Sequence, residues 1–441
     1  MNAVFQDGPL DREFWRGDID ARLPAVFRAG LATILLCDAL FLFPDISAFY
    51  GATGLWPAAL GSGPLVGVSD AALRLVWAGG CLSLLALALG WFSRLSAFLS
   101  CAFLVAVHHR DPSITTGGDY LAQILLAFCI VLDTGAAFSL DARWRGRARD
   151  FVAAAPWRAL QLHLAILYFV TARLKIRGGW LSGDGVYFGL QHFGFLRPPG
   201  AWLLAHPELC RVSTFVVLAL EGTFAFFALS PIKGRTARVC AAACSVAVQL
   251  GILLTMRVGF FTALMLWTSV LFLPATARAA VAVTPRDRRL RWALVALCNG
   301  VVLVVAWDVF VGRRFPLPAA VRQAQSALGL TQQYDLFGAT YEVQQWSARG
   351  VRADGREVDV MEATAPGFRS QVGWLFSPFY KVTFSPDADP AAIAQWMCRT
   401  YAANENAPLS QVTLAKHARQ PARPNMETPF IDTVLFTGPC Y

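Results

Sequence analysis

The chain has 441 residues, of which 56% are hydrophobic and 15% are charged. This composition excludes a disordered chain and an ordinary soluble globule, and it predicts a membrane protein that crosses the bilayer several times. The formal net charge is +9, but Lys and Arg stand mostly in short connections between apolar segments, as orientation signals do. We therefore expect the lipid bilayer, and no nucleic acid, as a partner.

Nine apolar segments are candidates for transmembrane helices, because a spanning helix needs roughly 20 mainly apolar residues. The third and eighth are the weakest. The nine segments cover residues 23–43, 71–92, 95–109, 120–140, 157–176, 212–230, 239–256, 258–275 and 290–311. Residues 1–22 are polar and contain no cleavable signal, so the first span is expected to direct insertion. The transmembrane domain is thus predicted over 23–311.

Basic residues mark alternate connections between these segments. Four arginines crowd residues 143–149, whereas residues 44–70 contain no Lys or Arg. Cytoplasmic loops carry the excess of basic residues, so the N-terminus is predicted to be cytoplasmic and the chain after residue 312 extracytoplasmic. A composition rich in Ala and Arg favours the bacterial inner membrane.

Two outer segments, 44–68 and 177–206, are apolar but interrupted by Gly and Pro. Interrupted backbone at membrane depth survives only when it packs against protein or lines a cavity. These segments therefore predict re-entrant structure around a pocket that opens to the outer side.

The last part of the chain, 318–441, is predicted to be a small extracytoplasmic α+β domain. Asp354-Gly355 lies between two strand-like runs and signals a hairpin. The expected strands of the domain cover 341–351, 356–364, 379–384 and 411–416.

A helix is predicted to begin at Asp389-Pro390, which supply an N-cap and a first-turn proline. Its buried face would carry Ile393, Trp396, Met397 and Tyr401. Cys398 and Cys440 can pair if this region is extracytoplasmic. The other eight cysteines fall in or beside apolar segments, without metal-type spacing.

Glu221 lies midway through the sixth span, where a carboxylate is either protonated or paired with a cation. His163 and Arg173 on the fifth span are candidate partners. A structural tie between helices is as good an interpretation as catalysis. Gln249 on the seventh span is expected to form a hydrogen-bonding tie.

The connection HHRDPSITTGGDY brings together His108, His109 and Asp119. It lacks the i,i+4 spacing that would make a metal site specific, so no metal is expected. Gly117-Gly118-Asp119 is typical of a tight turn in which Asp119 caps the following helix.

Lys175 stands at the end of the fifth span between Arg173 and Arg177, and a Gly-Gly-Trp break follows. One interpretation is a side chain that reaches toward the lipid headgroups. The other is a general base, since apolar burial and repulsion from the two arginines favour a neutral amine.

Over about residues 15–310 the chain resembles the horizontally transferred transmembrane (HTTM) family, which includes vitamin K-dependent gamma-glutamyl carboxylase. The resemblance rests on HHRDPSITTGGDYL, FSLD (138–141), YFVTARLKIRGGWLSGDGVYFGL (168–190), Glu221 and VGFFTALMLWTSVLFLP (258–274).

The resemblance implies an enzyme in which Lys175 deprotonates reduced vitamin K or another quinol. O2 then converts the quinol to an epoxide, and the base so formed prepares a glutamate of a secreted peptide for reaction with CO2, without a metal. The catalytic residues implied are Lys175, Asp119, Glu221 and His163. The substrate-binding residues implied are Trp180, Arg173, Arg177, His108, His109, Tyr187 and Gln249.

Two alternatives stay open at this point. A non-enzymatic membrane module could bind or mature a secreted peptide through the C-terminal domain. A transporter would also place a carboxylate such as Glu221 inside the membrane, although no inverted repeat is visible in the sequence.

Overall fold

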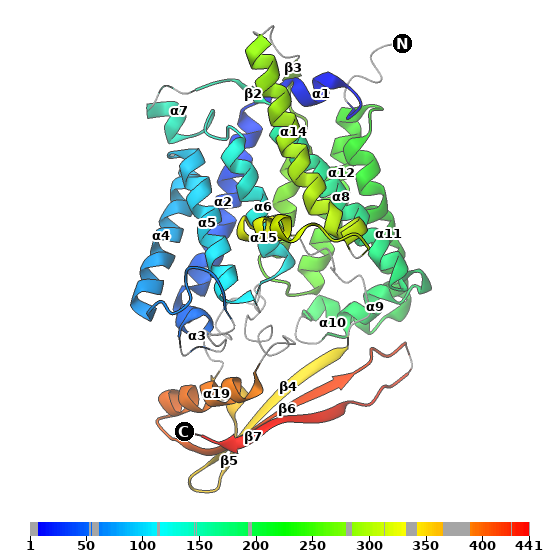
Figure 1. Cartoon of the computed structure of the whole chain (residues 1–441). Helices are drawn as coiled ribbons and strands as arrows, with labels where there is room; N and C mark the ends of the chain where they lie inside the picture. The colour runs from blue at the N-terminus through cyan, green and yellow to red at the C-terminus, as the bar shows by residue number, and fades with distance from the viewer. Residues whose placement is uncertain are drawn as a thin grey trace.

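A helical body with a β-sheet at one end makes up the protein, and the N-terminal segment lies at the other end (Figure 1). The computed structural model describes residues 8–52, 54, 61–112, 115–144, 146, 148–192, 196–278, 285–312, 314–331, 342–364, 389–424 and 426–440.

Within these residues, six helices are long and apolar enough to cross a membrane. They are α2 (Arg22–Leu42, continued by η1, Phe43–Asp45, and α3, Ile46–Tyr50), α4 (Asp70–Leu89), α8 (Ala155–Arg177), α11 (Pro207–Leu229), α12 (Gly234–Thr255) and α14 (Pro285–Trp307). The chain is therefore a polytopic helical membrane protein, and six of the predicted spans are helices long and apolar enough to cross the bilayer. The last of them, α14, continues into a π-helix, Asp308–Gly312.

The other three predicted spans also contain helices, but these do not meet the same criteria of length and composition. They are α5 (Ser93–Arg110), α6 (Gly117–Val131) and α13 (Phe261–Thr268), which continues into η6 (Ser269–Phe272). The count of nine spans thus stays a prediction. The fourth span was predicted too long, because the backbone becomes extended at Leu132 and α6 ends there.

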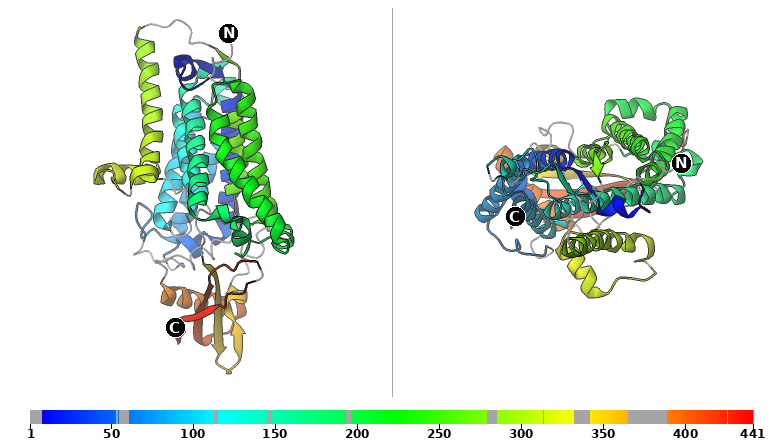
Figure 2. Two further views of the ribbon diagram at one scale, coloured as in Figure 1. Left: turned by 90° about the vertical axis from the view of Figure 1, so that its right-hand side faces the viewer. Right: turned by 90° about the horizontal axis from the view of Figure 1, so that it is seen from above.

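The most deeply placed span is α8. Two-thirds of its apolar window is buried, compared with less than half in each of the other five spans. Figure 2 shows α14, in yellow-green, at the margin of the helical body. Buried residues on α8 therefore face protein on most sides.

A small three-stranded sheet lies at the N-terminal end of the body. Its strands β1 (Asp18–Asp20), β2 (Phe151–Ala153) and β3 (Ala277–Arg278) pair in the order β2-β1-β3, at the same end of the body as α1 (Arg12–Arg16) and α7 (Leu140–Trp144). Strands of two or three residues are too short to produce a period in the sequence, and we did not predict them.

The predicted re-entrant segment 177–206 forms short helices next to the larger sheet (Figure 1). They are η4 (Trp180–Ser182), α9 (Gly185–Leu190) and α10 (Pro198–Leu204), and residues 193–195 lie outside the described residues. The segment 44–68 is described only in part. Re-entrant structure in both segments stays a prediction.

The C-terminal part holds a four-stranded antiparallel sheet in the order β5-β4-β6-β7. Its elements, in chain order, are α15 (Ala319–Ala327), β4 (Val343–Arg352), β5 (Glu357–Asp359), α16 (Val360–Thr364), α19 (Pro390–Glu405), β6 (Leu409–Arg419) and β7 (Ile431–Pro439). The predicted hairpin is confirmed, with Gly355 at a left-handed φ of 84°. Its second strand is shorter than predicted because α16 begins at Val360. The predicted strand 379–384 lies outside the described residues, and β7 was not predicted.

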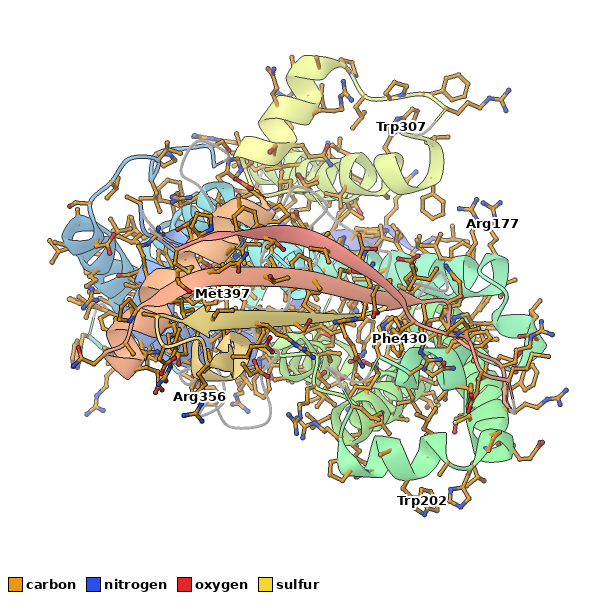
Figure 3. All side chains as sticks on the ribbon, turned by 90° about the horizontal axis from the view of Figure 1, so that it is seen from below. Arg177, Trp202, Trp307, Arg356, Met397 and Phe430 are labelled. Carbon is orange, nitrogen blue, oxygen red and sulfur yellow. A yellow bond between two sulfur atoms is a disulfide. The ribbon has the colours of Figure 1, made fainter. Side chains whose placement is uncertain are left out.

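Helix α19 begins where the sequence indicated. The Asp389 carboxylate accepts a hydrogen bond of 2.9 Å from the backbone N–H of Ala391, and Pro390 occupies the first turn. The predicted face of Ile393, Trp396, Met397 and Tyr401 is buried. A disulfide joins Cys398 of α19 to Cys440, which follows β7, so the helix is fastened to the edge of the sheet. Figure 3 shows Met397 beside one end of the strands.

Candidate functional site

Lys175 on α8 forms an ion pair with Glu221 on α11. The distance from Lys175 Nζ to Glu221 Oε1 is 2.5 Å, and the two side chains are 5% and 6% exposed. The amine therefore points into the protein, and the interpretation of Lys175 as a side chain that reaches for headgroups is wrong. Lys175, and not His163 or Arg173, is the partner of Glu221.

The two neighbouring arginines lie on other sides of α8. Residues two apart in a helix are separated by about 200° around its axis, so Arg173 and Arg177 point away from Lys175. The Arg173 guanidinium stands 5.9 Å from the centre of the Phe310 ring. Arg177 is exposed and extends from the edge of the body (Figure 3). Arg173 and Arg177 therefore do not share the face of α8 that carries Lys175.

Trp180 covers the Lys175 amine. The chain turns back at Gly179, which has a left-handed φ of 90°, and Trp180 then lies with its ring centre 4.9 Å from Nζ. Gly185 makes room for the ring, since a Cβ there would stand 2.2 Å from Trp180 Cδ2. Trp180, which the family resemblance implies as a substrate-binding residue, thus lies against the Lys175 amine.

A hydrogen-bonded network of buried polar side chains joins α8, α12 and η6. The Tyr168 hydroxyl and Ser245 Oγ are 2.8 Å apart, Gln249 Nε2 donates to the Tyr168 hydroxyl over 3.4 Å, and Ser269 Oγ donates to Ser245 Oγ over 3.2 Å. The Tyr168 ring stacks on Phe224 with 4.0 Å between ring centres. Gln249 is therefore a tie between α12 and α8, as the sequence indicated.

We did not predict Tyr168, Ser245 or Ser269 as parts of the site. A signal for Tyr168 exists in the sequence, because it precedes Lys175 by seven residues, or about two helical turns, and so shares its face of α8. Ser245 and Ser269 have no such signal, since their proximity depends on how α12 and η6 pack against α8.

Two acceptor oxygens of this cluster are buried and have no hydrogen-bond donor among the described residues. They are Glu221 Oε2 and Gln249 Oε1, on side chains whose residues are 5% and 3% exposed. A buried acceptor without a donor costs about 1–3 kcal/mol. A ligand that donates hydrogen bonds to these atoms would recover that cost.

A second polar cluster lies where α5 ends and α6 begins. His108 Nε2 is 3.3 Å from Asp119 Oδ1, and His108 Nδ1 is 2.5 Å from Gln123 Nε2. Asp119 Oδ2 also accepts a hydrogen bond from the backbone N–H of Thr116. The cap of α6 is Thr116, and Asp119 is the third residue of a capping box, which corrects the prediction that Asp119 is the cap itself.

The remaining predicted residues lie apart from the Lys175 pair. His163 is buried on α8, twelve residues before Lys175 and so about 18 Å away along the axis. Tyr187 is half-buried and packs in a small apolar cluster with Leu190, Cys210 and Met256. His109 Nε2 stands 3.1 Å from the Ser326 carbonyl oxygen, beside α15.

Two cavities stand out in the described part of the chain. One, of about 620 Å³, is lined almost entirely by apolar side chains of α5, α6, α14 and α15, with His109 among the lining residues. The other, of about 650 Å³, has a mixed lining of apolar and polar residues, and Arg94, Asp133 and Arg149 are among the polar ones. Lys175 lines neither cavity. Among the described residues, no group of three or more His, Cys, Asp or Glu side chains is placed to hold a metal ion.

The connection between β6 and β7 is tied to the helical body near this site. The side chain of Gln191, which follows α9, donates from Nε2 to the Ala422 carbonyl over 2.7 Å and accepts at Oε1 from the Ala422 N–H over 2.9 Å. Arg423 Nε lies 3.7 Å from Asp184 Oδ2. These contacts fasten the C-terminal sheet to the segment that carries Trp180.

The HTTM domain model matches residues 21–276, which is more than half of the chain. The chain belongs to the HTTM family. Lys175, Glu221, Gln249, His108 and Asp119 all fall within the HTTM match, whereas the C-terminal sheet lies outside it. HTTM domains occur in vitamin K-dependent carboxylase-like membrane proteins. No curated protein and no solved structure matches the chain.

Proposed function

We propose that this protein is a membrane enzyme that uses Lys175 as a general base on a hydroxyl of a lipophilic quinol, such as reduced vitamin K. The observation that carries the proposal is the buried ion pair between Lys175 and Glu221, 2.5 Å apart, beneath Trp180. A charged pair is costly to bury, and a cation inside a membrane protein usually has a function.

The pair provides a route to a neutral amine. In the dry interior, transfer of the lysine proton to Glu221 replaces two buried charges by two neutral groups. The Lys175 lone pair can then accept the proton of a substrate hydroxyl. The ammonium formed is held by the face of the Trp180 ring, 4.9 Å away, and by the substrate anion that has just formed.

Other residues position the substrate in this proposal. Tyr168 and Gln249 form the inner wall of the site and are held together by their hydrogen bond. Gln249 Oε1, a buried acceptor without a donor among the described residues, can accept a hydrogen bond from a hydroxyl of the ligand. A bound quinol supplies the electrons for reaction with O2. We further propose that the enzyme uses CO2 and that a glutamate of a secreted peptide is the residue to which CO2 is added.

The test is formation of the oxygenated product, a quinol epoxide, by the purified full chain supplied with a prenylated naphthoquinol and O2. We expect Lys175→Met to lower the rate at least 100-fold. The matched control is Lys233→Met, which removes an exposed lysine at the start of α12, and it should retain the wild-type rate. Equal amounts of product from the wild type and Lys175→Met would show that Lys175 is not the general base.

Peptide binding by the C-terminal sheet is a second candidate function. Strand β7 is at the edge of the sheet, where among the described residues it pairs only with β6. Ile431 and Val434 on β7 are 69% and 64% exposed. An extended peptide can add to such an edge. If peptide binding is the whole function, Ile431→Glu with Val434→Glu abolishes capture of the secreted peptide, and Lys175→Met leaves it intact.

We also propose that the N-terminal segment is cytoplasmic and that the sheet lies outside the cytoplasm of the bacterial inner membrane. The disulfide between Cys398 and Cys440 supports this orientation, since disulfides persist in oxidising compartments. Alkylation of cysteine thiols in intact cells, with and without reductant, tests whether Cys398 and Cys440 are joined by a disulfide in the cell. A fully reduced pair in growing cells would contradict the orientation.

A further inference from the structure

Three polar side chains form a hydrogen-bonded row across neighbouring strands of the C-terminal sheet. Ser347 Oγ on β4 lies 2.8 Å from His417 Nε2 on β6, and His417 Nδ1 lies 2.7 Å from Asp432 Oδ1 on β7. The row therefore has the order hydroxyl, imidazole, carboxylate. It lies outside the HTTM match, which ends at residue 276, and outside the Lys175 site.

The strand register puts the row on the face of the sheet that α19 does not cover. On the other face, Ala348 and Leu414 are paired and buried in the core that includes α19. Side chains alternate between the two faces along a strand, so Ser347 and His417 point away from that core. Asp432 is directly opposite His417 and shares its face. Seen from below, the strands lie in front of the helical body (Figure 3), and the side chains of His417 and Asp432 are 29% and 70% exposed.

The two hydrogen bonds of His417 give each member of the row a chemical role. An ionised carboxylate only accepts hydrogen bonds, so the proton of the neutral imidazole is on Nδ1, toward Asp432. The other ring nitrogen, Nε2, then has a lone pair that accepts the proton of the Ser347 hydroxyl. A nucleophile, its general base and a group that orients the base are arranged in this way in serine hydrolases of unrelated folds.

The neighbours of Ser347 on the same face indicate the kind of substrate. Ala415 is directly opposite Ser347 and has only a methyl group beside the hydroxyl, and Val434, its partner on β7, is 64% exposed. A short apolar acyl group can pack on these two side chains. Arg349 is exposed and follows Ser347 by two residues, so it shares the face. Its guanidinium can stabilise the oxyanion that forms when the hydroxyl adds to a carbonyl group.

We propose that Ser347, His417 and Asp432 form a second catalytic site, which hydrolyses carboxylic esters of short apolar acids. Ser347 Oγ bonds to the carbonyl carbon while its proton moves to His417 Nε2. The bond to the alcohol oxygen then breaks, and the alcohol leaves with this proton. Water that gives a proton to the same nitrogen attacks the acyl group, so the acid is released and the serine hydroxyl is restored. The site needs no quinol and acts independently of Lys175.

The first measurement uses the purified full chain in detergent and a fluorophosphonate, which a nucleophilic serine attacks with loss of fluoride. Peptide mass spectrometry of the labelled wild type should find the label on Ser347. His417→Gln should slow labelling at least about 100-fold, because it removes the general base. Asp432→Asn should slow it at least about tenfold, because the imidazole loses its orienting charge. Ser410 is the matched control within the chain, since its hydroxyl, also on β6, donates to the Val351 carbonyl over 2.9 Å and should stay unlabelled.

The second measurement is the rate of hydrolysis of p-nitrophenyl butyrate. Ser347→Ala should lower this rate at least about 100-fold, because it removes the nucleophile. Ser410→Ala removes a hydroxyl from the same sheet and should keep the wild-type rate. Lys175→Met should also keep it, because the ester site does not include the buried ion pair.

A label on other residues but not on Ser347 overturns the inference, and so does the absence of any label. Equal rates of labelling in the wild type and His417→Gln, or equal hydrolysis by the wild type and Ser347→Ala, would also overturn it. In each of these cases the row only ties the strands of the sheet together, and the proposed role of Lys175 is unaffected.

Discussion

Removal of one partner of the buried ion pair should lower the stability of the folded protein far more than removal of both partners. Glu221→Leu leaves the Lys175 amine buried without its carboxylate, and Lys175→Met leaves Glu221 in the same condition, since both side chains are at most 6% exposed. Loss of one partner of a buried pair costs about 3–5 kcal/mol, whereas apolar replacement of both is often neutral. The double variant should therefore recover most of the stability.

This loss of unfolding free energy can be converted to a shift in melting temperature. Unfolding entropy is about 2.1 cal/mol/K per residue, so for this length about 1 kcal/mol shifts the midpoint by about 1 °C. Each single variant should melt about 3–5 °C lower than the wild type, and the double variant within about 2 °C of it. The free buried thiols, such as Cys129 and Cys210, report unfolding through a thiol-reactive dye. If the melting temperature of the double variant falls by the sum of the two decreases seen in the single variants, the two side chains do not interact.

Three further outcomes are expected elsewhere in the chain. Replacing Cys398 and Cys440 by serine should cost the sheet about 2–5 kcal/mol and make it sensitive to protease, and unchanged protection would contradict a stabilising bond. Gln191→Ala removes two hydrogen bonds to Ala422 and should speed amide exchange in the β6–β7 connection about tenfold or more, but not in α19. Asp119→Ala removes one half of the capping box and should lower the melting midpoint by about 1 °C, whereas a loss above about 5 °C would mean that Asp119 has a larger structural role.

The sequence predicted the parts of the fold that depend on local pattern. The spans at 71–92 and 212–230 correspond to α4 and α11 because a crossing helix is one continuous apolar run. Helix α19 was placed by Asp389-Pro390, whose capping chemistry acts within three residues. Strand β7 was missed: most of its residues are exposed, so it lacks the alternation of a half-buried strand.

The site was predicted one residue at a time but not as an arrangement. Lys175 and Glu221 were both singled out as costly charges, but they are 46 residues apart in the chain, and only the packing of α8 against α11 makes them partners. Arg173 and Arg177 were grouped with Lys175 by closeness in sequence. The helical rotation per residue separates them, and that part of the prediction could have been corrected from the sequence alone.

Whether Lys175 acts as the base on a quinol is tested by an experimental structure of the full chain with a prenylated naphthoquinol bound in the absence of oxygen. We predict one ring hydroxyl within hydrogen-bond distance of Lys175 Nζ or Glu221 Oε2, with the ring beside Trp180 and Tyr168. A ring bound instead in the apolar cavity of about 620 Å³ between α5, α6, α14 and α15, with Lys175 still closed onto Glu221, would contradict it.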